Sequence, residues 1–201
     1  NANPIFIDCD GYLNIDVFKF KKFIDQNTYI KEGYSYNKNT SRRIMAVIPV
    51  HVSGNAVDIE EIVKICKEKN IKVVEDAAEA MGTRCISGDI KNKHAGTLGD
   101  VGCLSFNGNK IITSGGGGMI ITDSEEYANK ARYLSTQAND DSINYVHNSI
   151  GYNYRLTNIQ AAVGVGQLEK LDEFVNKKKY INNFYKEALR DSDNFVIQEC
   201  P

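Results

Sequence analysis

Short apolar runs alternate with amphipathic segments along most of this chain, and each run has the length of a β-strand. The run at residues 44–50 is continuously apolar, which is typical of a strand covered on both of its faces. We predict five strands, at residues 5–8, 44–50, 71–74, 101–106 and 119–122.

Amphipathic segments with helical spacing separate these strands. We predict helices that begin at Asn14, Asp58 and Ser124, because each of these side chains can cap a helix N-terminus. The first is expected to end near residue 26 and the third near residue 134. In the second, apolar residues at positions 59, 62, 63 and 66 share one stripe.

A capping box formed by Thr157 and Gln160 marks the start of a longer helix, which we expect to continue with a bend to about residue 190. The strand–helix alternation predicts an α/β fold with three α/β/α layers and a mostly parallel sheet. The two strands that flank Lys110 are adjacent in sequence and can break the parallel pattern locally.

The composition excludes several classes of protein. A formal net charge of −2 gives no electrostatic reason to expect binding to nucleic acid or to an anionic membrane. No run of about 18 apolar residues is present, as a membrane-spanning helix would need. The five cysteines are scattered, without a C-x-x-C pair or a nearby histidine cluster, which favours reduced thiols in a cytoplasmic protein and no metal site.

Two residues at predicted strand ends could carry chemistry. Asp76 follows a buried strand, where open α/β sheets gather ligands, and a carboxylate there can keep a pyridine nitrogen protonated. Lys110 lies in a turn after the next strand, where a partly desolvated amine becomes a nucleophile. The structural alternatives are that Glu75 and Asp76 cap the following segment, and that Lys110 is a solvent-exposed loop lysine.

Other residues at strand ends and in loops could take part in the same chemistry as Asp76 and Lys110. Ser105 can turn its hydroxyl toward a phosphate, and the glycines at 115–118 permit close backbone approach, although they match no nucleotide-binding motif. His51, at the end of an apolar run, fits both a binding role and a hydrogen-bonded turn. Asn153 and Arg155 suit an oxyanion or a phosphate, but a loop without a ligand is equally compatible.

In their order and spacing, these segments resemble the DegT/DnrJ/EryC1/StrS family of pyridoxal phosphate (PLP)-dependent sugar aminotransferases. The resemblance covers about residues 4 to 190. It is carried by Pro49-Val50-His51 with Gly54, Glu75-Asp76-Ala77-Ala78-Glu79-Ala80 with Gly82, Gly99-Asp100 with Ser105-Phe106 and Lys110, the glycines at 115–118, and Gly151-Tyr152-Asn153-Tyr154-Arg155-Leu156 with Gln160-Ala161-Ala162.

The resemblance implies the type I PLP-dependent aminotransferase fold. Residues 1–156 would then form the PLP-binding large domain without its N-terminal part. Residues 157–201 would form an interdomain helix and the start of a truncated small domain. The chain opens without a methionine, and a strand-like run begins as early as residue 5, so we expect the chain to be an internal fragment that is incomplete as a PLP site.

The resemblance also implies roles for individual residues. Lys110 would be the catalytic lysine that forms a Schiff-base link to PLP and moves a proton, and Asp76 would pair with the pyridine nitrogen. Glu79 would contact the ring hydroxyl, at a position that is often glutamine. Ser105 would bind the phosphate, and Asn153 would reach the phosphate from the other subunit of a homodimer. His51 and Arg155 are further candidates for substrate or phosphate contacts.

The activity that the resemblance implies is transfer of an amino group from an amino acid, usually glutamate, to a keto group of a nucleotide-linked sugar. Such sugars serve bacterial surface-glycan or antibiotic biosynthesis. Two alternatives remain: a PLP-dependent sugar dehydratase of the same fold, and a catalytically silent domain for dimerisation or regulation. Some dehydratase relatives carry histidine at the lysine position, so Lys110 favours transamination.

Overall fold

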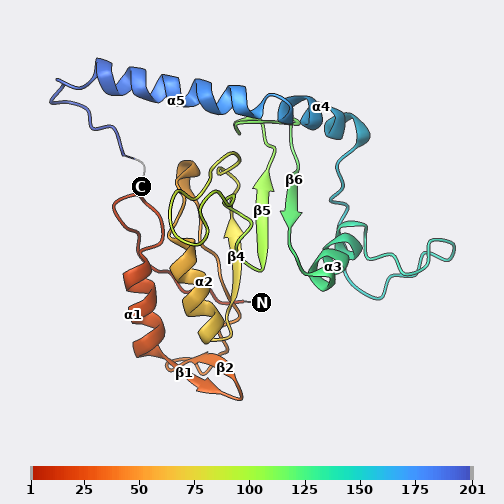
Figure 1. Cartoon of the computed structure of the whole chain (residues 1–201). Coiled ribbons are helices and arrows are strands. Elements are labelled where there is room, and N and C mark those ends of the chain that lie inside the picture. The colour runs from red at the N-terminus through yellow and green to blue at the C-terminus, as the bar shows by residue number, and fades with distance from the viewer. Residues whose placement is uncertain (1, 200–201) are drawn as a thin grey trace.

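The computed structural model describes residues 2–199. Its centre is a four-stranded sheet in the order β3-β4-β5-β6 (Figure 1). The strands are β3 (Ala46–Val47), β4 (Lys72–Asp76), β5 (Val101–Ser105) and β6 (Gly118–Ile121). The pairs β3–β4 and β4–β5 are parallel, and β5–β6 is antiparallel. The α/β class and the mostly parallel sheet are therefore confirmed, and the parallel pattern breaks at the strands that flank Lys110.

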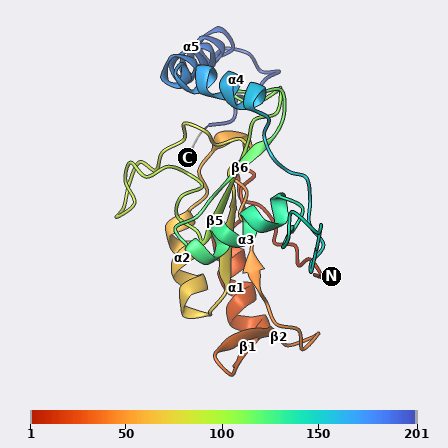
Figure 2. The ribbon, with the colours of Figure 1, turned by 90° about the vertical axis from the view of Figure 1, so that its right-hand side faces the viewer.

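Helices pack on the sheet at several places. α1 packs against α2, α2 against β4, and α3 against β6. α4 and α5 cross above the end of the sheet where β5 turns back into β6 (Figures 1 and 2). The bounds are α1 (Val17–Asn27), α2 (Ile59–Glu68), α3 (Glu125–Ser135), α4 (Asn158–Leu168) and α5 (Leu171–Ala188), with a small hairpin of β1 (Thr28–Lys31) and β2 (Tyr34–Asn37) and a 3₁₀ turn η1 (Val52–Gly54).

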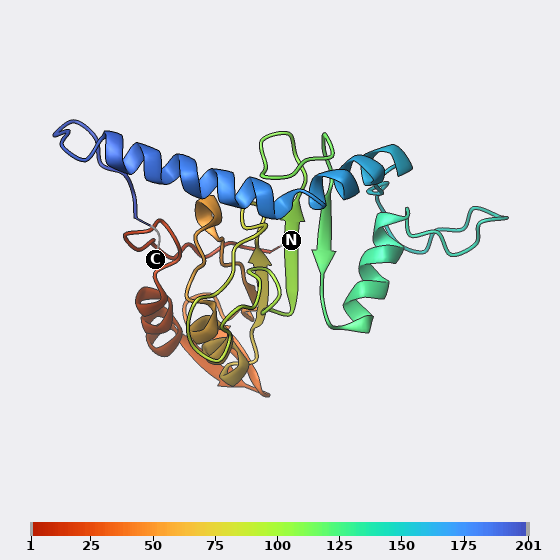
Figure 3. The ribbon, with the colours of Figure 1, turned by 45° about the horizontal axis from the view of Figure 1, so that its top comes forward.

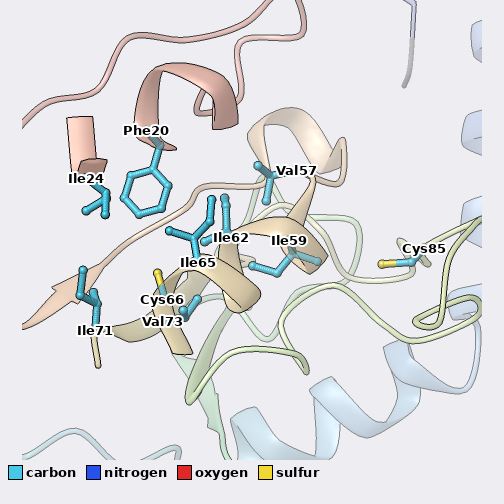
Figure 4. Packing of buried hydrophobic residues seen from close by; sticks show 10 residues of the cluster. All are labelled: Phe20, Ile24, Val57, Ile59, Ile62, Ile65, Cys66, Ile71, Val73 and Cys85. Carbon is cyan, nitrogen blue, oxygen red and sulfur yellow. The ribbon is translucent and has the colours of Figure 1, made fainter. Parts of the chain in front are cut away.

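The main core lies between α1, α2 and β4. Phe20 and Ile24 of α1 face the apolar stripe of α2, and Val73 of β4 closes the cluster from the sheet side (Figure 4). The stripe consists of the buried residues Ile59, Ile62, Ile65 and Cys66. Asp58 caps α2 as predicted, because its carboxylate accepts the Glu61 N–H. Burial raises the pKa of the Cys66 thiol to about 12, which makes it an inert core group.

The predicted cap of α1 was wrong. Asp16, not Asn14, is the N-cap, and its carboxylate accepts the Lys19 N–H at 2.9 Å. Asn14 is instead 1% exposed, and its amide donates to Asn55 O and accepts from Val52 N. A buried amide needs partners for both of its ends, so Asn14 joins two loops rather than capping a helix.

Two strand predictions also need correction. Residues 5–8 form no strand; an isolated bridge between Cys9 and Ile15 follows them, and Phe6 is 89% exposed. β3 is shorter than the apolar run at 44–50. Met45 and Ile48 are exposed, because the α1–α2 core covers only one face of this segment within the described residues.

The later helix starts follow the sequence closely. Ser124 caps α3, and Thr157 and Gln160 form the capping box of α4. The long helix is not merely bent: α4 ends at Leu168 and α5 starts at Leu171, as Figure 3 shows. Among residues 2–199, no helix combines the length and apolar character needed to cross a membrane.

Truncation of the core should cost far more than the same truncation at the surface. Ile62 is 0% exposed, so Ile62→Ala should lower the free energy of unfolding by about 2–5 kcal/mol. Ile86 is 74% exposed, so Ile86→Ala should change the free energy of unfolding by less than about 0.5 kcal/mol. Urea denaturation measures both; equal losses would contradict the described core.

Candidate active site

The candidate site lies where β4 and β5 end side by side. Asp76 is opposite Cys103 in the parallel register, and Ala77 N–H donates to Cys103 O at 2.9 Å. Side chains alternate along a strand, so Asp76, Cys103 and Ser105 share one face of the sheet. Burial and the nearby Asp76 charge raise the pKa of the Cys103 thiol.

The Asp76 carboxylate keeps a free acceptor on a rigid backbone. Its Oδ1 accepts the Ala78 N–H at 3.1 Å, while Oδ2 accepts no hydrogen bond from residues 2–199. The Asp76 N–H donates to Pro49 O, and Asp76 O accepts the His51 N–H. The main chain is therefore held toward β3 while one carboxylate oxygen stays available.

Lys110 is not a freely solvated loop lysine. Its Nζ lies 3.2 Å from Glu79 Oε1, and its side chain is only 16% exposed. The second Glu79 oxygen accepts the Ser53 N–H at 2.9 Å. The Ser53 amide and the Lys110 ammonium hold the pKa of the Glu79 carboxyl below its usual range. Glu79, which follows β4, thus joins the turn after β3 to the Lys110 amine in the turn after β5.

Ser105 and the glycine run form the other side of this edge. Ser105 Oγ accepts the Asn107 N–H, which leaves its hydroxyl hydrogen available to a ligand. Gly117 has a φ of 84°, and a Cβ there would collide with the Leu156 side chain. Glycine is therefore required for the chain before α4 to close over the turn between β5 and β6.

The donor set fits PLP. The cofactor needs an amine for its aldehyde carbon, an acceptor for its ring N–H and donors for its phosphate. Lys110, Asp76 and Ser105 offer these three groups at the ends of adjacent strands. Within residues 2–199, no three His, Cys, Asp or Glu side chains cluster in a way that would hold a metal ion.

His51 lies in the interior rather than at this edge. It is 0% exposed, and its Nδ1 accepts the Val57 N–H at 3.2 Å. The ring proton is therefore on Nε2, which lies 2.9 Å from Glu75 Oε2 and donates to it. No ring nitrogen of His51 is left for a substrate or a phosphate, so the structure favours the hydrogen-bonded alternative.

Asn153 and Arg155 lie in the chain that links α3 to α4. Asn153 forms an isolated bridge with Thr136, and both candidate residues are exposed. Among residues 2–199, neither side chain hydrogen-bonds to Lys110, Asp76 or Ser105. The segment before Asn153 extends outward from the sheet (Figure 3). A contact made from another subunit stays a prediction.

Glu75 has a larger part in the structure than its sequence position indicated. It is 0% exposed, and its carboxylate accepts hydrogen bonds from His51 Nε2 and from the amides of Gly96, Leu98 and Gly99. Burial alone would raise its pKa, but these hydrogen bonds outweigh burial and hold the pKa below the usual value. The signal in the sequence was a charged residue directly after a strand that was predicted to be buried.

The sequence and the fold of this chain are similar to those of known aminotransferases. The DegT/DnrJ/EryC1/StrS aminotransferase family matches residues 1–201. The chain is 47% identical over 192 residues to "Putative pyridoxal phosphate-dependent aminotransferase EpsN" of Bacillus subtilis (strain 168), covering 96% of this chain and 46% of EpsN. It is 36% identical over 188 residues to GDP-perosamine synthase of Escherichia coli O157:H7, covering 94% of this chain and 46% of the synthase.

A solved structure shows the same fold. The crystal structure of a DegT DnrJ EryC1 StrS aminotransferase from Brucella abortus superposes with a TM-score of 0.83 at 28% identity, covering 100% of this chain and 50% of that one. The chain spans slightly less than half the length of the curated relatives named above. With a match along its whole length, the chain belongs to the DegT/DnrJ/EryC1/StrS aminotransferase family.

Proposed function

We propose that the protein containing this chain is a PLP-dependent aminotransferase that moves an amino group from glutamate to a keto group of a nucleotide-linked sugar. One observation carries the proposal: the Lys110 amine is held against Glu79 at the strand edge that also presents the Asp76 carboxylate. The sugar substrate is supported by relatives named GDP-perosamine synthase and UDP-4-amino-4,6-dideoxy-N-acetyl-beta-L-altrosamine transaminase. A cytoplasmic role in glycan biosynthesis belongs to the same proposal.

Each residue would have a distinct task. Bound PLP supplies an electron sink for the bonding electrons of the substrate carbon. Lys110 would bond to the cofactor and, once released, carry a proton at its Nζ. The free Asp76 oxygen would hold the proton on the ring nitrogen, and the Ser105 hydroxyl would donate to the phosphate. Glu79 would orient the Lys110 amine and face the ring hydroxyl.

We further propose that two copies of the chain complete each site. The chain between α3 and α4 carries exposed apolar side chains, among them Ile143 and Ile150, both 84% exposed. Exposed apolar groups of this kind indicate a protein interface. Asn153 follows directly and would reach the phosphate in the partner's site. The division into a large domain at 1–156 and a following segment at 157–201 belongs to the same proposal.

Two other functions can be separated from this one by experiment. A silent dimerisation or regulatory domain would form no visible PLP chromophore. A dehydratase would form one but would not be converted to the pyridoxamine form by glutamate. Lys110 favours transamination, because it supplies the amine that can carry the transferred proton.

The covalent bond to PLP is predicted to form at Lys110 alone. In the full-length protein, Lys110→Arg should abolish the visible absorbance with PLP and the borohydride-fixed adduct, because arginine stays charged. Transamination should fall at least about 1,000-fold. Lys91→Arg changes an exposed lysine in the same way and is the matched control. A labelled peptide that excludes Lys110 would overturn the assignment.

The ring-nitrogen role of Asp76 predicts a different defect. Asp76→Asn keeps the shape of the side chain but loses the charge that holds the ring proton. Borohydride should still fix PLP to Lys110, while the glutamate half-reaction slows at least about 100-fold. Stopped-flow absorbance measures that step. An unchanged rate in Asp76→Asn would show that another group protonates the ring.

Sharing of the site between subunits predicts complementation. Lys110→Ala and Asn153→Ala homodimers should each be inactive or strongly impaired. After mixing and subunit exchange, about half of the dimers are hybrids with one intact site, so about a quarter of the wild-type activity should return. Mixtures that stay at the level of the separate variants would contradict a role for Asn153 across the interface.

A further inference from the structure

The Glu75 carboxylate is the centre of a buried set of hydrogen bonds on the face of β4 opposite Asp76. Its Oε2 accepts from His51 Nε2 at 2.9 Å and from Gly96 N at 2.8 Å. Its Oε1 accepts from Leu98 N at 2.6 Å and from Gly99 N at 2.5 Å. Four donors thus converge on one side chain that is 0% exposed.

Only a carboxylate satisfies all four donors. An ionised carboxylate accepts at both oxygens, whereas glutamine would turn an NH₂ group toward at least one backbone N–H. His51 cannot compensate by moving its proton to Nδ1, because the Val57 N–H already occupies that nitrogen. Glutamine at position 75 would therefore leave buried donors unpaired.

This carboxylate joins the two segments that flank β4 at the level of Asp76. His51 belongs to the chain that leaves β3, and the Gly96–Gly99 amides belong to the loop that returns to β5. The loop lies directly over β5: a Cβ at Gly102, the register partner of Glu75, would overlap Gly96 O. Glu75 therefore holds both neighbours of β4 at the level of Asp76.

The main chain of Asp76 depends on these same neighbours. Pro49 and His51 bond to it on the β3 side, and the next residue, Ala77, bonds to Cys103 on the β5 side. The position of the Asp76 carboxylate relative to Ser105 therefore follows from how tightly both flanking segments are held. The proposed chemistry gives the buried side chains of Glu75 and His51 no direct part.

We propose that Glu75, supported by His51, is a positioning residue that sets the Asp76 carboxylate against the cofactor ring. The inference rests on the proposed function, since Asp76 is the ring-nitrogen partner only in a PLP enzyme. Glu75 itself would touch neither cofactor nor substrate, because it is buried on the other face of the strand.

A double-mutant cycle in the full-length protein tests the proposal. Glu75→Gln should weaken PLP binding about 10-fold and slow the glutamate half-reaction. In an Asp76→Asn background, the same Glu75→Gln change should alter both quantities less than about 2-fold, because the group that it positions is already lost. Ile62→Val is the matched control: it loosens the core on the same side of β4, and its effect should persist unchanged in both backgrounds.

Equal effects of Glu75→Gln in the two backgrounds would show that Glu75 is only a structural residue and would overturn the proposal. Unchanged PLP binding in the Glu75→Gln single variant would also overturn it. If Glu75→Gln does not fold, His51→Leu removes one of the four donors and runs through the same cycle with the same expected non-additivity.

Amide hydrogen exchange without PLP separates this proposal from the proposed function. The Gly96, Leu98 and Gly99 amides should be protected in the wild-type protein and exchange faster in Glu75→Gln. Protection with no PLP binding by the wild type would refute the PLP function and, with it, the Asp76 role, while leaving the buried network intact. PLP binding with no change in exchange would refute the Glu75 inference alone.

Discussion

Parallel hydrogen bonding between β4 and β5 sets Asp76 beside Cys103, and strand alternation then divides the surrounding groups between two faces. Asp76, Cys103 and Ser105 lie on the face that presents the site. Glu75 lies on the other face, opposite Gly102, where the returning loop crosses the strand. A register shift of one residue would exchange these faces and bury the carboxylate that the chemistry needs.

The charged side chains on the two faces of the sheet differ in burial and in their partners. On the buried face, His51 Nε2 and three backbone amides donate hydrogen bonds to the Glu75 carboxylate, so both oxygens of this buried charge have donors. At the candidate site, the Glu79 side chain is 44% exposed and forms an ion pair with Lys110. Such a partly exposed pair can exchange partners when a ligand arrives, whereas the buried set cannot do so without leaving donors unpaired.

Local chemistry explains which features could be predicted from the sequence. Asp58, Ser124 and Thr157 were recognisable as caps because each precedes an amphipathic segment. Asn14 also precedes such a segment, which is why it was wrongly predicted to be a cap. Its side-chain amide instead forms hydrogen bonds with loop residues 38 and 41 positions away in the sequence. Residues 5–7 are apolar but have no strand partner among residues 2–199, and apolarity alone does not supply one.

The candidate site shows the same limit. Lys110, Asp76 and Ser105 follow strand ends, so their meeting at one edge could be expected from topology. His51 and Glu75 could not be paired in this way, because their contact joins residues 24 apart through tertiary packing. Glu75 is adjacent in sequence to Asp76, but side chains alternate along β4, so the two carboxylates lie on opposite faces of the sheet and have different roles.

The most direct measurement is a crystal structure of the full-length protein with PLP. Continuous density is expected from Lys110 Nζ to the cofactor, with Asp76 Oδ2 within hydrogen-bond distance of the ring nitrogen and the four donors still hydrogen-bonded to Glu75. PLP bonded to another lysine, or a ring nitrogen facing a group other than Asp76, would contradict it.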